Sequence, residues 1–258
     1  MKNLKVWLVI LPLFTIACSD EYTGEITETA HMTESAKTSG IGPDNPANPT
    51  ETAHMTESAK TSGIGPDNPA NPFDIAGSIH NEILGTLDET NFSSQSIEDI
   101  TILIDSVSAM YPELVPLSSY STLSARLSEI TWIVNNYDAI DDVLEASTLG
   151  VNAKTSFLTF VNSLALTAND PYGDIHSMIV FYEESILANT GFTTEDKRIL
   201  LTTTSVVRYS AYRERTDKDW ETSVTKMAAT VSGAEQSLVS GLKMALIVGI
   251  CKNNNITQ

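Results

Sequence analysis

Cysteine and basic residues are scarce in this chain of 258 residues. Its two cysteines, Cys18 and Cys251, exclude a disulfide-rich scaffold and a zinc site built from cysteines. Lysine and arginine together number 15 against 33 aspartates and glutamates, which gives a formal net charge of -18. Nucleic acid and anionic membrane surfaces would repel such a chain, so we expect neither of them to bind it.

Long apolar runs and the signature motifs of catalysis are lacking too. Two apolar runs, residues 6–17 and 242–251, are each too short to span a bilayer comfortably. The motifs G-x-S-x-G, G-x-x-x-x-G-K-[ST], H-E-x-x-H, C-x-x-C and G-x-G-x-x-G do not occur. Their absence excludes the recognisable hydrolase, nucleotide-binding and zincin classes, and we predict no cofactor. An enzyme without such a signature stays an alternative.

The beginning of the chain has the pattern of a bacterial signal peptide. A positively charged start and the uncharged residues 6–17 lead to Ala17, directly before Cys18. This ending resembles a lipobox, in which the cysteine is acylated and becomes the first residue of the mature protein. Thr15 stands where a leucine is usual. We predict a lipoprotein signal peptide over residues 1–17 and lipidation of Cys18, against an ordinary signal peptide with a chance cysteine.

The residues after Cys18 indicate where the protein goes. Ser19 favours sorting to the outer membrane, and Asp20 and Glu21 resemble the surface-export signal of Bacteroidota lipoproteins. Acylation with palmitate or a similar fatty acid supplies more than one lipid chain, so we expect stable anchoring. The pattern favours the cell surface and leaves a periplasmic orientation open.

A perfect tandem repeat follows this region. Residues 27–49 read TETAHMTESAKTSGIGPDNPANP, and residues 50–72 repeat them letter for letter. Two copies cannot bury a solenoid core, and isoleucine and methionine are the only large apolar residues of each copy. Such a segment cannot offset the entropy that it loses on ordering. We therefore predict a disordered tether over residues 18–72.

Helical periodicity begins after the repeat. The first apolar stripe recurs every fourth residue, at Ile75, Ile79, Ile83 and Leu87. Similar stripes recur along the rest of the chain, including a short one over residues 139–146, and no strand-like alternation or hairpin turn appears. We predict an all-α fold, with a single bundle-like domain of about seven to nine helices over residues 73–258.

The last predicted helix, residues 234–251, is the most apolar of all. We predict that it is a core helix, and the alternative is a hydrophobic tail that docks on a partner or a membrane. Cys251 lies at its end. If Cys18 is acylated, Cys251 has no disulfide partner within the chain, and we expect a buried, unreactive thiol.

Two histidines and three carboxylates are the best candidates for a metal or catalytic site: His80, Glu82, Asp170, Asp174 and His176. They could close a site if their helices meet. Both histidines, however, stand next to apolar stripe positions, where a histidine is usually a boundary residue. The two aspartates lie at a predicted helix start, where their charge meets the positive end of the helix dipole. We therefore predict no metal site and no catalytic residue.

A second candidate site combines arginine with tyrosine on one predicted helix. Arg208, Tyr209, Tyr212 and Arg213 could bind an anionic ligand, with arginine as donor and tyrosine as stacking surface. Acidic residues surround this stretch in the sequence. An internal network of ion pairs is therefore the alternative, and the one that we favour.

Two stretches resemble an uncharacterised group of Bacteroidota lipoproteins. One is NPFDIAG at residues 71–77 with His80 and Asn81 after it, and the other is LLTTTSVVRYSAY at residues 200–212. The resemblance implies a lipoprotein of the outer membrane. It brings no activity with it and no role for any residue.

These patterns together predict a lipid-anchored, surface-exposed envelope protein with a non-catalytic binding or interaction role. Its partner would be the membrane, through the anchor, together with a protein or an anionic glycan. One alternative is an envelope hydrolase with a cleft between helices. Another is a factor in competition between bacteria, either a toxin or an acidic immunity protein for a basic toxin.

Overall fold

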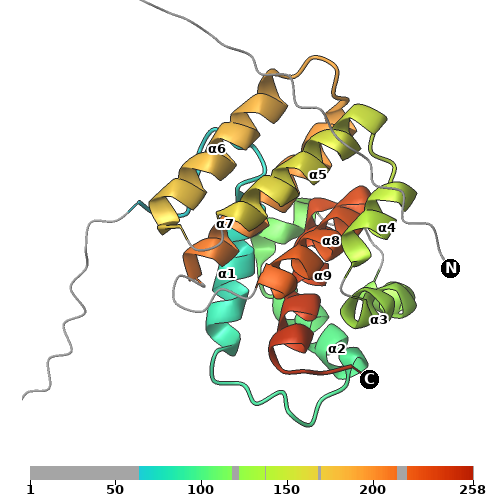
Figure 1. Ribbon diagram of the computed structural model, residues 1–258. Coiled ribbons are helices and arrows are strands. Elements are labelled where there is room, and N and C mark those ends of the chain that lie inside the picture. Colours follow the sequence, from blue (N-terminus) through green and yellow to red (C-terminus); the bar gives the residue numbers. More distant parts are fainter. Residues whose placement is uncertain (1–63, 118–121, 137, 168–169, 214–219, 258) are drawn as a thin grey trace, which may run out of the picture. The chain divides into compact units, whose positions relative to one another are not determined.

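The computed structural model describes residues 64–117, 122–136, 138–167, 170–213 and 220–257, without the side chains of residues 220–222. Cys18, the signal peptide and the first copy of the repeat lie outside these residues. The described residues form nine α-helices and two 3-10 helices and contain no β-strand (Figure 1). The prediction of an all-α fold is confirmed.

The elements follow one another with short connections. In chain order they are α1 (Ile75–Leu87), α2 (Ile97–Ser108), η1 (Pro112–Leu117), η2 (Leu123–Arg126), α3 (Leu127–Asn135), α4 (Ala139–Ala146), α5 (Val151–Leu166), α6 (Tyr172–Ala188), α7 (Thr194–Arg213), α8 (Trp220–Gln236) and α9 (Leu238–Asn253).

The last helix, α9, forms the centre of the fold. It packs against α1, α2, α3, α7 and α8, and residues 242–251 are buried apart from Lys243, which is half-buried (Figure 1). A helix that is apolar all round belongs in the interior, so the prediction of a core helix is confirmed. Cys251 is buried in this helix, and burial raises the pKa of its thiol to about 12.

Helices α8 and α9 form an antiparallel hairpin. The chain leaves the helical conformation at Ser237, whose side chain accepts a hydrogen bond from the backbone N–H of Ser240 and so caps α9. A Cβ atom at Gly233 would lie 2.5 Å from the carbonyl oxygen of Ser240, and one at Gly249 would lie 3.0 Å from the side chain of Lys226. Small residues therefore let the two helices approach closely from the turn to their far ends.

No helix in the described part of the chain combines the length and the apolar character that crossing a bilayer requires.

The folded domain begins earlier than the sequence predicted. Residues 64–72, the end of the second repeat copy, pack against α6 and α7, and Asn68 and Asn71 are buried. The predicted tether boundary at residue 72 is therefore wrong for these nine residues. The prediction counted only apolar side chains, whereas this segment is held through polar ones.

Candidate functional site

The two candidate histidines have separate surroundings. His80 is buried in α1, and burial together with the positive charges of Lys226 and Arg213 lowers its pKa to about 3. Its Nδ1 atom has no hydrogen-bond partner among the described residues. His176, in α6, has a pKa that burial and the positive charge of Arg208 lower. Each imidazole is therefore held neutral by its own set of cations, not by shared carboxylates.

The three candidate carboxylates do not join the histidines. Glu82, Asp170 and Asp174 are exposed, and Glu82 lies on a different side of α1 from the buried His80. Within the described ranges, no group of three or more histidines, cysteines, aspartates or glutamates is placed to hold a metal ion. The fold thus does not bring these five residues together.

The arginines and tyrosines of α7 contact other parts of the protein. Arg208 is fully buried and forms ion pairs with Asp74 and Glu183. The Tyr209 hydroxyl donates to Asp74 at 3.2 Å, and Arg213 pairs with Asp88. These contacts are the internal ion-pair network that the sequence left as the alternative, and burial keeps Arg208 out of reach of an anionic ligand.

Tyr212, the fourth member of that candidate set, packs with its ring edge on Tyr172 at 5.2 Å between centroids. This contact joins α7 to the first residue of α6. It gives Tyr212 a packing role at the same end of the two helices.

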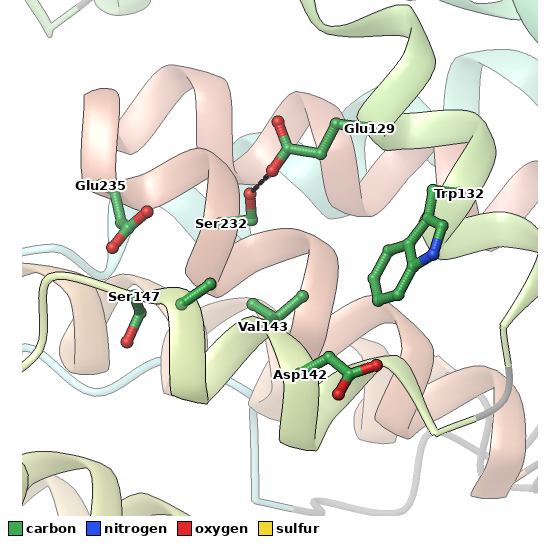
Figure 2. A pocket seen from close by; sticks show the side chains of 8 residues that line it. Glu129, Trp132, Asp142, Val143, Ser147, Ser232 and Glu235 are labelled. Carbon is green, nitrogen blue, oxygen red and sulfur yellow. Dashed lines mark hydrogen bonds between the residues drawn. The ribbon is translucent and has the colours of Figure 1, made fainter.

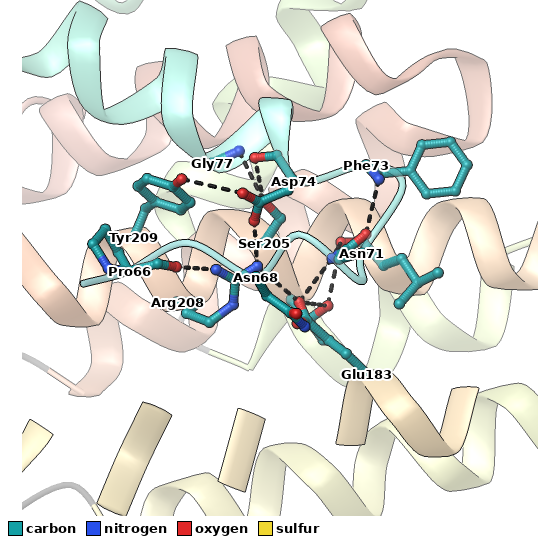
Figure 3. A network of polar contacts seen from close by, with 12 residues as sticks. Pro66, Asn68, Asn71, Phe73, Asp74, Gly77, Glu183, Ser205, Arg208 and Tyr209 are labelled. Carbon is teal, nitrogen blue, oxygen red and sulfur yellow. Dashed lines mark hydrogen bonds and ion pairs between the residues drawn. The ribbon is translucent and has the colours of Figure 1, made fainter. Parts of the chain in front are cut away.

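Glu183 lies at the centre of the buried network (Figure 3). Its side chain, on α6, is fully buried, and it accepts hydrogen bonds from Asn68 at 2.6 Å, Asn71 at 2.8 Å and Thr204 at 2.9 Å. Arg208 adds an ion pair at 3.3 Å. A buried carboxylate is tolerated because every part of it is paired, and the donors come from three separate segments of the chain.

The asparagines of the repeat also fold their own segment. The Asn68 side-chain oxygen accepts from the backbone N–H of Ala70 at 3.1 Å, and that of Asn71 accepts from Phe73 at 2.9 Å. Both amide groups therefore remain free to donate to Glu183, and Asn71 also donates to the carbonyl oxygen of Leu201 at 3.0 Å. Each asparagine thus shapes the segment with its oxygen and holds it on the domain with its nitrogen.

A hollow of about 390 Å³ opens between α3, α4 and α8 (Figure 2). Its lining residues are contributed in closely spaced sets by the three helices and the end of α4: Glu129, Trp132, Asp142, Val143, Ala146, Ser147, Ser232 and Glu235. Spacing of three or four residues places such positions on one face of a helix. The sequence gave no sign of this pocket, because each set looks like an ordinary helix surface until the three helices meet.

The carboxylates of this pocket differ in how they are paired. Glu129 is held by Arg126, with N–O distances of 2.9 and 2.8 Å, and accepts a further hydrogen bond from Ser232. Glu235 accepts from the backbone N–H and the hydroxyl of Thr148. Only Glu129 thus forms an ion pair with a guanidinium, so the pocket carries an excess of negative charge.

Trp132 supplies an aromatic wall to the same pocket, and 40% of its surface is exposed. An indole face beside carboxylates attracts a cation through its quadrupole, while the apolar ring covers the carbon atoms of the ligand. The pocket also lies at the carboxyl ends of α4 and α8, where the helix dipoles add negative potential. Its chemistry suits an ammonium or guanidinium group.

The chain was also compared with known proteins. No protein family, curated protein or solved structure matches it. Its function is therefore argued from the pocket and from the amino-terminal sequence.

A second hollow, of about 320 Å³, lies between α5 and α6. Serine and threonine hydroxyls line it together with Phe160, Phe181 and Tyr182, and it contains no charged side chain. Phe160 and Tyr182 stack at 4.3 Å between ring centroids, so most of its aromatic surface is already used in packing the two helices. The charged pocket therefore offers the more specific chemistry.

Proposed function

We propose that the protein is an envelope lipoprotein, anchored through Cys18, whose helical domain binds a cationic ligand without changing it covalently. The ligand class is a primary amine or guanidinium, carried by a small molecule or by a basic protein. The observation that supports this proposal is the convergence of Glu129, Asp142 and Glu235 around the exposed ring of Trp132.

Charge and accessibility support a cation over an anion. Three carboxylates face one guanidinium, that of Arg126, and the whole chain carries a formal charge of -18. Such a field draws cations toward the surface and raises their rate of association. An anionic glycan would meet repulsion here, and the arginines of α7 pair with carboxylates of the protein. We therefore favour a cationic partner over the anionic glycan that the sequence suggested.

Titration with spermidine, a trivalent amine, tests the binding proposal. We expect it to quench the fluorescence of Trp132, to bind with a dissociation constant below about 1 mM, and to be recovered chemically unchanged. The double substitution Asp142→Asn/Glu235→Gln should weaken binding at least about tenfold, because each removes a carboxylate that faces the ligand. Trp132→Phe should remove the optical signal.

A matched control separates the pocket from the general acidity of the chain. Asp141→Asn/Glu145→Gln removes two exposed carboxylates of the same helix that do not line the pocket. We expect this variant to bind spermidine nearly as well as the unchanged protein. Equal weakening by both double variants, or no binding at millimolar spermidine, would show that the pocket is not a cation site.

The anchor is tested independently of the pocket. We expect radiolabelled palmitate to be incorporated into the chain and to be lost in the variant Cys18→Ser, which should leave the envelope fraction. Retention of an unlabelled Cys18→Ser variant in the envelope would contradict the anchor. Accessibility of the intact cell surface to added protease then distinguishes an outward from a periplasmic orientation.

A further inference from the structure

The docked end of the second repeat copy is recognised at defined positions (Figure 3). Asn68 and Asn71 donate to Glu183, and the carbonyl oxygen of Pro66 accepts from Arg208. The receiving groups belong to α6 and α7, far along the chain from the segment that they hold. The groove between them, lined by Glu183, Arg208 and the Leu201 carbonyl, is called the docking groove below.

Every group that the repeat presents to this groove exists a second time in the chain. Residues 41–49 have the same sequence as residues 64–72, IGPDNPANP, so Pro43, Asn45 and Asn48 correspond to Pro66, Asn68 and Asn71. The remaining network partner, Asp74, belongs to the chain after the repeat and would stay in place whichever copy is docked. The groove therefore cannot distinguish the two copies by their own residues.

We propose that the docking groove also accepts the first copy, residues 41–49 of the same chain, in exchange for residues 64–72. The chain then has two docking registers that differ by 23 residues, and residues 50–72 form a loop in the second register. Such a loop joins neighbouring points, which 23 residues span easily. The proposal does not depend on the cationic pocket.

Loop closure sets the balance between the two registers. The second copy continues directly into α1 and needs no loop, whereas docking of the first copy closes one of 23 residues. The entropic factor grows roughly as the 3/2 power of loop length, which disfavours the first copy by about a hundredfold. The second copy is therefore the docked one in the unchanged protein, and the first takes its place when the second is weakened.

The exchange changes the free length of the tether. From Cys18 to the docked segment there are 46 residue steps in one register and 23 in the other. As flexible coils these reach roughly 37 Å and 26 Å. Duplication of the docking segment thus provides a reserve attachment point closer to the predicted anchor.

A labelled peptide of the sequence IGPDNPANP tests recognition directly. It is added to two full chains that both carry Asn68→Ala/Asn71→Ala, one with both repeat copies and one from which residues 27–49 are deleted. The single-repeat variant has a vacated groove and should bind the peptide with a dissociation constant below about 0.1 mM. In the two-repeat variant the first copy competes at an effective concentration of about 1 mM, so the peptide should bind at least about tenfold more weakly.

Two further variants complete the design. Adding Asn45→Ala/Asn48→Ala to the two-repeat variant should restore peptide affinity to that of the single-repeat chain. Adding Glu183→Gln should weaken peptide binding in both chains. Equal affinity in the one-repeat and two-repeat variants, or no peptide binding to the vacated groove, would overturn the proposal.

A milder substitution covers the case in which the double variants do not fold. In the full chain with Asn71→Ala alone, hydrogen exchange is measured at the amides of Ala70 and Ala47, which are equivalent positions in the two copies. We expect Ala70 to lose protection and Ala47 to gain it, independently of protein concentration. An unprotected Ala47 would overturn the proposal, and protection that rises with concentration would assign the exchange to a second chain instead.

Discussion

The substitution Glu183→Gln should destabilise the domain strongly although it changes almost no volume. Glu183 accepts hydrogen bonds from three neutral side chains and an ion pair from Arg208, and no water-exposed position is available to it. A glutamine amide presents an N–H group where a carboxylate oxygen accepted. Whichever way the amide turns, at least one donor of the network meets another donor.

The magnitude follows from the hydrogen bonds that this substitution breaks. One charge-assisted hydrogen bond contributes about 1.5–3 kcal/mol, and the buried donor left without a partner costs about 1–3 kcal/mol more. Arg208 keeps Asp74 as an ion-pair partner, so its charge is not left uncompensated. We therefore expect a loss of about 3 kcal/mol in the free energy of unfolding, which for a domain of this size lowers Tm by roughly 6–12 °C.

Urea denaturation followed by far-UV circular dichroism measures this change. The matched control is Glu184→Gln, which makes the same chemical change one residue later, at an exposed position of the same helix. It should stay within about 0.5 kcal/mol of the unchanged protein. If Glu183→Gln were no more destabilising than Glu184→Gln, the reasoning that this carboxylate organises the domain would be refuted.

Two further predictions concern α1. Gly77→Ala should cost about 1–3 kcal/mol in thermal unfolding, because the added Cβ would lie 2.4 Å from the carbonyl oxygen of Ser205 on α7. Gly85→Ala in the same helix, where nothing lies within 4 Å, should stabilise by about 0.5–1 kcal/mol, and equal effects of the two would contradict the close packing. His80 has a pKa of about 3 when folded and 6.5 ordinarily, so the unfolded chain binds the extra proton between these values. Stability should fall by about 1.4 kcal/mol per pH unit below pH 6.5 on this account, and His80→Asn should flatten that decline in urea titrations at successive pH values, whereas an unchanged slope would show that His80 does not cause it.

Helices were predictable from the sequence because their signal is local. The apolar stripe of α1 recurs within the helix itself, and the short helix predicted over residues 139–146 coincides with α4 (Ala139–Ala146). The break at Ser237 was not predicted, since the apolar pattern runs through it and only the capping hydrogen bond to Ser240 marks the turn. Periodicity reports which face is buried but not where two apolar helices fold back on each other.

The sites were less predictable because they depend on distant segments. Glu183 looks like one of two adjacent glutamates in a helix, and its burial follows only when Asn68 and Asn71 meet it from residues more than a hundred positions away. Trp132 gave no signal on its own, since it shares a pocket with residues of two other helices. The candidate set around His80 failed to converge for the same reason: spacing along one helix says nothing about which helix faces it.

The central position of α9 determines when the domain can fold during synthesis. Helices α1, α2, α3, α7 and α8 all pack against it, yet it is the last of them to leave the ribosome. Until then these helices have no common partner to bury their apolar faces, so the growing chain stays open to chaperones. A truncation that removes α9 would abolish the whole fold and not merely its end.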